Sequence, residues 1–194
     1  YLDICNDVSL LARLEMHGID VGDRWDVLAR KSSGRIDERL MAFADAHFSL
    51  ALATAEPARA GEMLASLRDD SFGKGGWTDR VTTDVGISIC RAMIARHAGD
   101  PGMAVDLLMP IRYQLPVLGG SHAQRDLFAM LLIDSAIQDN RWKTATALLS
   151  ERALNKPGNV WTLQNYAKAL NQVGATAKAA GVKADLERLL TAAG

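Results

Sequence analysis

The chain has 194 residues, and its 22 Lys and Arg side chains nearly balance its 23 Asp and Glu side chains, which gives a formal net charge of -1. This composition lacks the basic excess that neutralises phosphates, so it argues against a nucleic-acid partner. No stretch reaches the roughly 20 uninterrupted apolar residues of a membrane span. Cys5 and Cys90 form neither a CxxC motif nor a disulfide framework, which favours a reducing, cytoplasmic location.

Apolar residues recur at helical spacing along almost the whole chain. One stripe runs through Ile36, Leu40, Phe43 and His47, and another runs from Ala104 to Ile111. Neither stripe alternates as a strand does, so we expect no β-sheet. The pattern predicts ten helices, over roughly 3–17, 22–32, 36–54, 57–69, 79–98, 101–113, 121–139, 141–154, 159–173 and 176–192.

Two of the predicted helix starts carry capping signals. Asp100 followed by Pro101 predicts an N-cap with proline in the first helical position. Gly119 and Gly120 permit a tight turn, and Ser121 with Gln124 three residues later predicts a capping box. These signals mark the starts of the helices over 101–113 and 121–139.

The ten predicted helices group into five helical hairpins. The first helices begin near residues 1, 36, 79, 121 and 158, and this irregular period of about 35 to 43 residues is close to that of the tetratricopeptide repeat and to those of longer helical repeats. The segment from Asn140 to Ala145 has the aromatic and small residues typical of a second tetratricopeptide helix. The sequence therefore predicts an all-α, TPR-like α-solenoid of about five hairpins in a right-handed superhelix, forming a single domain over 1–194.

Several segments carry a family resemblance. Ile111–Gln114 followed by Gly119–Phe128 resembles the equivalent segment of the tetratricopeptide repeat protein 38 family, and Leu14–Trp25 and Phe43–His47 look similar to it too. The resemblance implies stacked helical hairpins. Because family members are longer on the N-terminal side, it also implies that this chain is the C-terminal part of a longer protein. It implies no established activity and no catalytic residues.

His122, Arg125 and Asp126 form the first group of candidate binding residues. They lie in the first turn of a predicted helix, where free backbone N–H groups can hold a ligand and a histidine can donate or accept a proton. The preferred interpretation, however, is a capped helix start with a histidine that faces solvent, because the capping box alone accounts for the residue pattern. Arg125 and Asp126 point in different directions on the helix, so we expect each to form a salt bridge with a neighbouring hairpin.

His47 is the other candidate binding residue, and it follows Asp45 on an apolar stripe. A core histidine with satisfied hydrogen bonds is the preferred interpretation, and a ligand or base is the alternative. No two histidines lie three or four residues apart, so no zinc site is predicted. The glycine-rich segment 71–78 lacks the GxxxxGK[ST] spacing of a phosphate loop, so we expect a flexible connector and no cofactor.

These observations favour a protein-interaction scaffold without catalytic activity, which binds an unidentified protein or peptide on a concave face formed by the first helices. The alternative is an enzyme or small-ligand-binding protein with a pocket near His47, His122 and Arg125. A third hypothesis is a structural assembly segment. The first helix has apolar residues on both sides, among them Leu2, Ile4 and Leu10, which predicts an exposed apolar surface and raises the hypothesis of a homodimer.

Overall fold

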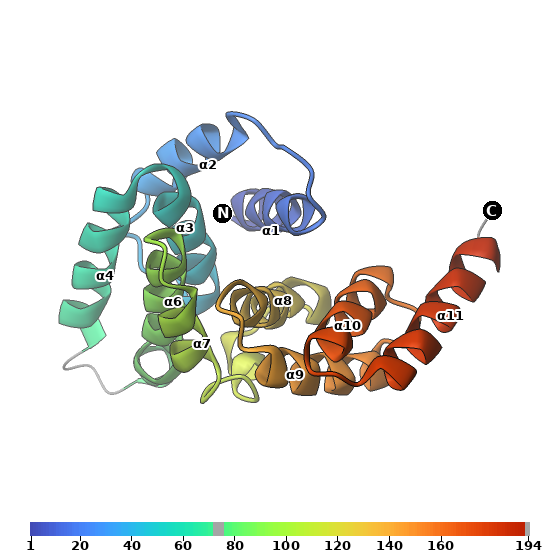
Figure 1. Cartoon of the computed structure of the whole chain (residues 1–194). Coiled ribbons are helices and arrows are strands. Elements are labelled where there is room, and N and C mark those ends of the chain that lie inside the picture. The colour runs from blue at the N-terminus through green and yellow to red at the C-terminus, as the bar shows by residue number, and fades with distance from the viewer. Residues whose placement is uncertain (72–75, 193–194) are drawn as a thin grey trace. The chain divides into compact units, whose positions relative to one another are not determined.

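The computed structural model describes residues 1–71 and 76–192. Over these ranges the fold is helical, without a strand (Figure 1). The helices are α1 (Leu2–Met16), α2 (Arg24–Ser33), α3 (Ala42–Ala55), α4 (Pro57–Ser71), α5 (Trp77–Val81), η1 (Thr82–Gly86), α6 (Ile87–His97), α7 (Pro101–Leu108), η2 (Leu115–Leu118), α8 (His122–Gln138), α9 (Trp142–Asn155), α10 (Val160–Gln172) and α11 (Thr176–Ala192).

The segments α5, η1 and α6 follow one another without a break and form one helix, in which η1 is a π-helical turn. The short segment η2 is a single 3-10 turn. Counted in this way, the described part of the chain has ten helices, and each of them matches one predicted from the sequence. The all-α prediction is confirmed. Of the glycine-rich connector expected over 71–78, residues 72–75 lie outside the described residues.

The start of α3 differs from the prediction by six residues. The apolar stripe suggested a start at Ile36, but the helix begins at Ala42. Arg39 has a φ of 44°, in the left-handed region, which breaks the helical path between the two positions. Ile36 is nevertheless buried, so the first member of the stripe reaches the core from a turn.

The end of α7 also differs from the prediction. The helix stops at Leu108, whereas the stripe that continues to Ile111 suggested an end near residue 113. Pro110 has no N–H to donate and its ring clashes with the preceding turn, so the α-helix cannot continue through it. At its start, α7 follows the prediction, because the Asp100 carboxylate accepts a hydrogen bond of 2.8 Å from the Met103 N–H.

The chain divides into two compact units, Tyr1–Leu132 and Ile133–Gly194. In the first unit α3 is the central helix, and it packs against α1, α2, α4 and α6. Every residue from Ala42 to Ala53 is buried, which fits a helix surrounded by other helices on all sides. Asp45, His47 and Ser49 are therefore buried together with its apolar side chains.

The second unit contains α9, α10 and α11, coloured orange to red in Figure 1. Here α10 packs against both α9 and α11. Its buried face carries Trp161, Leu163 and Tyr166. The buried Arg152 side chain donates from Nε to Thr162 Oγ1 at 2.9 Å, so its charged group is hydrogen-bonded inside the unit.

No helix in the described ranges is both long and apolar enough to cross a membrane. The apolar residues of α1 divide between two faces. Ile4, Val8 and Leu11 are buried by this chain, whereas Leu2 and Leu10 are exposed. The exposed apolar surface predicted on the first helix is therefore present but covers one side of it.

Candidate functional site

The capping box predicted at the start of α8 is present. The Gln124 N–H donates to Ser121 Oγ at 3.2 Å, and the Ser121 N–H donates to Gln124 Oε1 at 2.8 Å. Each side chain therefore satisfies a backbone donor that the first turn of a helix leaves without an intrahelical partner.

We expect the Ser121→Ala variant to lose about 1 kcal/mol of unfolding free energy, because it removes the acceptor for the Gln124 N–H. Urea unfolding followed by circular dichroism measures this loss. The neighbouring His122→Ala variant is the control, since it removes no cap. Equal midpoints for the native chain and the Ser121 variant would contradict the assignment.

Arg125 folds back onto the loop that precedes its own helix. Its guanidinium donates to the Gly119 carbonyl oxygen at 2.9 Å and also to the Gly120 carbonyl oxygen. One of its nitrogens lies 3.5 Å from Nδ1 of His122. We expected Arg125 to form a salt bridge with another hairpin, but its hydrogen bonds close the glycine turn instead. Asp126, the next residue in the helix, is half-buried.

His47 lies in the core of the first unit and is fully buried. Its Nδ1–H donates to the Phe43 carbonyl oxygen at 2.7 Å, and its Nε2 lies 3.1 Å from the Ser9 hydroxyl, which donates to it. The ring is 4.4 Å from the Phe43 ring and 5.1 Å from the Phe128 ring, measured between centroids. Burial lowers the pKa of His47 to about 4, so the ring is neutral.

The structure brings both groups of predicted residues close to Phe43. The phenyl ring packs against the His47 ring. A Cβ placed on Gly120 would lie 2.8 Å from Phe43 Cε2, so the glycine turn lies directly against the same ring. His47 and the glycine turn therefore share Phe43 as a neighbour.

Asp45 is a second buried titratable group on α3. Burial raises the pKa of its carboxyl to about 7, and the charge of Arg39 opposes this rise only in part. Cys5 and Cys90 are buried in the same unit and form no disulfide bond, as expected from the sequence. Burial raises the pKa of both thiols, so neither is an activated nucleophile.

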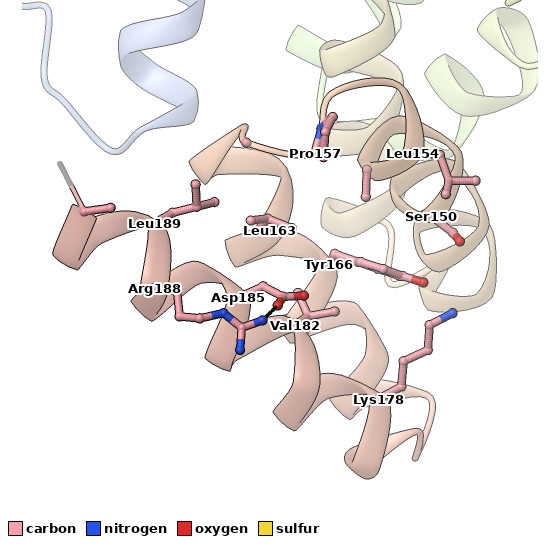
Figure 2. Close-up of a pocket in the computed structure, with 13 residues that line it drawn as sticks. Ser150, Leu154, Pro157, Leu163, Tyr166, Lys178, Val182, Asp185, Arg188 and Leu189 are labelled. Atoms are coloured by element: carbon pink, nitrogen blue, oxygen red, sulfur yellow. Dashed lines mark hydrogen bonds and ion pairs between the residues drawn. The ribbon is translucent and has the colours of Figure 1, made fainter.

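The second unit contains a cavity that the sequence analysis did not predict. Its volume is about 700 Å³, and side chains of α9, α10, α11 and the turn between α9 and α10 line it (Figure 2). We call it the α9–α11 groove. Its lining residues are Ser150, Ala153, Leu154, Pro157, Gly158, Leu163, Tyr166, Lys178, Val182, Asp185, Arg188, Leu189 and Ala192.

The lining of the groove is mainly apolar, and its polar side chains form two groups, one with Ser150, Tyr166 and Lys178 and the other with Asp185 and Arg188 (Figure 2). Figure 2 shows the Tyr166 hydroxyl directed toward the side where the Ser150 oxygen and the Lys178 nitrogen lie. The Lys178 ammonium lies 5.4 Å from the centroid of the Tyr166 ring. Elsewhere along α11, Arg188 forms an ion pair with Asp185.

No sequence motif marks this groove. Leu154, Tyr166 and Lys178 come from three different helices, so only the packing of the helices brings them together. Among the described residues no group of three His, Cys, Asp or Glu side chains is arranged to hold a metal ion.

No protein-family model matches the chain, and no solved structure matches it. The resemblance to the tetratricopeptide repeat protein 38 family therefore stays a prediction. What the structure establishes is an all-α fold of ten helices in the described ranges, packed mostly with their neighbours in sequence.

Proposed function

We propose that this protein is a tetratricopeptide-like scaffold that binds a segment of a partner protein in the α9–α11 groove. The observation that carries the proposal is the groove itself. It combines a volume within the usual range of binding sites with an apolar lining that includes Leu154, whose side chain is 82% exposed. A concave, mainly apolar surface with a few polar groups is the usual construction of a binding site.

The construction of the groove also favours a scaffold. Its walls are three successive helices that pack as neighbours, as helices do in stacked helical hairpins. Regular helices hold lining residues in fixed positions, so a partner meets a surface that is already formed. Helical hairpins recur along the chain, and on this basis we extend the proposal to a solenoid.

The environment of His47 favours the scaffold over the enzyme alternative. Both of its ring nitrogens have partners in the core, and the Phe43 and Phe128 rings cover it. A general base must reach the proton that it removes. The fully buried His47 ring therefore supports the fold and is not part of a surface that a substrate or partner could reach.

A peptide library displayed on phage, selected against the native protein, tests the proposal. We expect enriched sequences that bind the native chain and lose at least about tenfold in affinity to the Leu154→Asp variant, because the substitution removes apolar contact and places a carboxylate against the apolar side chains of the partner. Fluorescence anisotropy of labelled synthetic peptides measures these affinities.

The Leu190→Asp variant is the matched control. Leu190 is 53% exposed and lies on α11, but it does not line the groove. This variant should bind the selected peptides as the native chain does. Absence of enriched peptides, or peptides that the Leu154 substitution leaves unaffected, would overturn the proposal.

A further inference from the structure

We infer that the segment bound in the α9–α11 groove carries an acidic side chain, whose carboxylate docks among Lys178, Tyr166 and Ser150 while its apolar neighbours fill the rest of the groove. This inference rests on the proposed function and adds the chemistry of the partner to it.

The first support is the convergence of three hydrogen-bond donors. Ser150 comes from α9, Tyr166 from α10 and Lys178 from α11, and all three line the same groove. Figure 2 shows the Tyr166 hydroxyl between the Ser150 and Lys178 side chains, on one side of the cavity. An ammonium and two hydroxyl groups together form a suitable site for a carboxylate, which accepts several hydrogen bonds at once.

The second support is the balance of charge. Arg188 is already paired with Asp185, so these two side chains neutralise each other. For Lys178, no carboxylate among the described residues lies within ion-pair distance, and its contacts within the groove are with the ring and the hydroxyl of Tyr166. The groove therefore has one positive charge that an acidic group of a partner can complement.

The pKa of the Tyr166 phenol is consistent with a positive charge on this side of the groove. Burial alone would raise the pKa of its phenol, but hydrogen bonding with Lys178 and Ser150, together with the positive charge of Lys178, brings the pKa below its ordinary value. An environment that favours a phenolate over a phenol also favours a carboxylate placed beside it.

The third support is the apolar remainder of the groove, which selects a peptide over a small free anion. Leu154, Leu163, Val182 and Leu189 line the surface beside the donors. A free phosphate would leave these side chains uncovered, whereas a peptide with leucine-sized residues beside its acid covers them. An exposed ion pair contributes little free energy alone, so the apolar contacts supply most of the affinity and the acid determines the choice of partner.

The experiment compares each selected phage peptide with a synthetic twin in which its Glu or Asp is replaced by Gln or Asn. For the native chain we expect the acidic peptide to bind roughly tenfold more tightly than its amide twin. For the Lys178→Met variant, which keeps the apolar stem, we expect the ratio to fall to about one, since the charge that distinguishes the twins is gone. The Lys183→Met variant is the control, because Lys183 is exposed on the same helix but does not line the groove.

Peptides that bind through Leu154 but show no preference for the acid, or a preference that the Lys178 substitution leaves unchanged, would overturn this inference and leave the proposed function standing. Competition with millimolar inorganic phosphate gives a second test. If phosphate abolishes acid-dependent binding equally for peptides with and without apolar residues beside the acid, the groove is a small-anion site and this inference is wrong. Failure to select any peptide would overturn the proposed function itself.

Discussion

The Asp45→Asn variant should be more stable than the native chain near pH 8 and should show a loss of stability in acid that the native chain does not. Asp45 is 3% exposed, and burial raises the pKa of its carboxyl from 3.8 to about 7. The folded protein thus binds this proton more tightly than the unfolded chain. The resulting stability is fully present below about pH 4 and is lost as the pH rises to about 7, and it amounts to roughly 4 kcal/mol.

His47 has the opposite dependence on pH. Burial lowers its pKa from 6.5 to about 4, so the unfolded chain binds the proton more tightly. The stability that the neutral ring contributes is present above about pH 6.5 and is lost as the pH falls through about 4, and it amounts to roughly 3 kcal/mol. Between these pH values the contributions of Asp45 and His47 nearly cancel in the native chain.

When the Asp45 carboxyl is removed, nothing offsets the pH-dependent contribution of His47 to the free energy of unfolding. We expect the unfolding free energy of Asp45→Asn to fall by roughly 3 kcal/mol between about pH 6.5 and about pH 4, while that of the native chain stays nearly level. Urea unfolding at several pH values measures both curves. Asp84→Asn, which changes an exposed carboxylate on η1, is the control and should follow the native curve. Parallel curves for Asp45→Asn and the native chain would contradict the opposed contributions.

The Gly120→Ala variant should lose roughly 2–5 kcal/mol of unfolding free energy, because two costs add. Gly120 has a φ of 70°, where an L-residue is strained. The new Cβ would also lie 2.8 Å from Cε2 and 3.1 Å from Cδ2 of Phe43. That ring is buried against His47, so it has little room to move away.

Gly119→Ala separates these two costs. Gly119 has a φ of 79° and a ψ of -157°, a backbone conformation that is nearly restricted to glycine, but a Cβ there would meet nothing within 4 Å, so a strain of about 1–3 kcal/mol is its only cost. Crowding of Phe43 is a cost that only Gly120→Ala carries, so this variant should lose more unfolding free energy than Gly119→Ala in chemical denaturation. If both variants lose the same free energy, the turn does not pack on this ring as described.

Local signals in the sequence predicted the helices well, because each depends on residues close together in the chain. The Asp100 cap and the Ser121–Gln124 capping box are contacts across three residues, and both have the expected geometry. The two wrong boundaries have local causes as well. Pro110 ends α7 inside an apolar stripe, and the left-handed Arg39 delays the start of α3.

Contacts between distant residues could not be predicted in the same way. The partner of His47 Nε2 is Ser9, which lies 38 residues away, and no spacing rule connects the two. The α9–α11 groove depends in the same way on how three helices pack, so Lys178 looks like any other solvated lysine in the sequence. Arg125 was expected to reach another hairpin, but carbonyl groups only five and six residues before it were closer partners.

The π-helical turn η1 changes how residues are counted along the helix that contains it. Val81, Val85, Ile89 and Met93 are all buried, at steps of four residues. In an α-helix each such step turns about 400°, so three steps would carry the stripe about 120° around the axis. The π-helical turn η1 is wider than an α-helical turn, so the chain rotates fewer degrees around the axis per residue there. This smaller rotation keeps the buried residues closer to one face of the helix. Compared with an uninterrupted α-helix that buries the same face, this helix holds one additional residue, so a correct alignment of the two would place a single-residue gap in the middle of a helix.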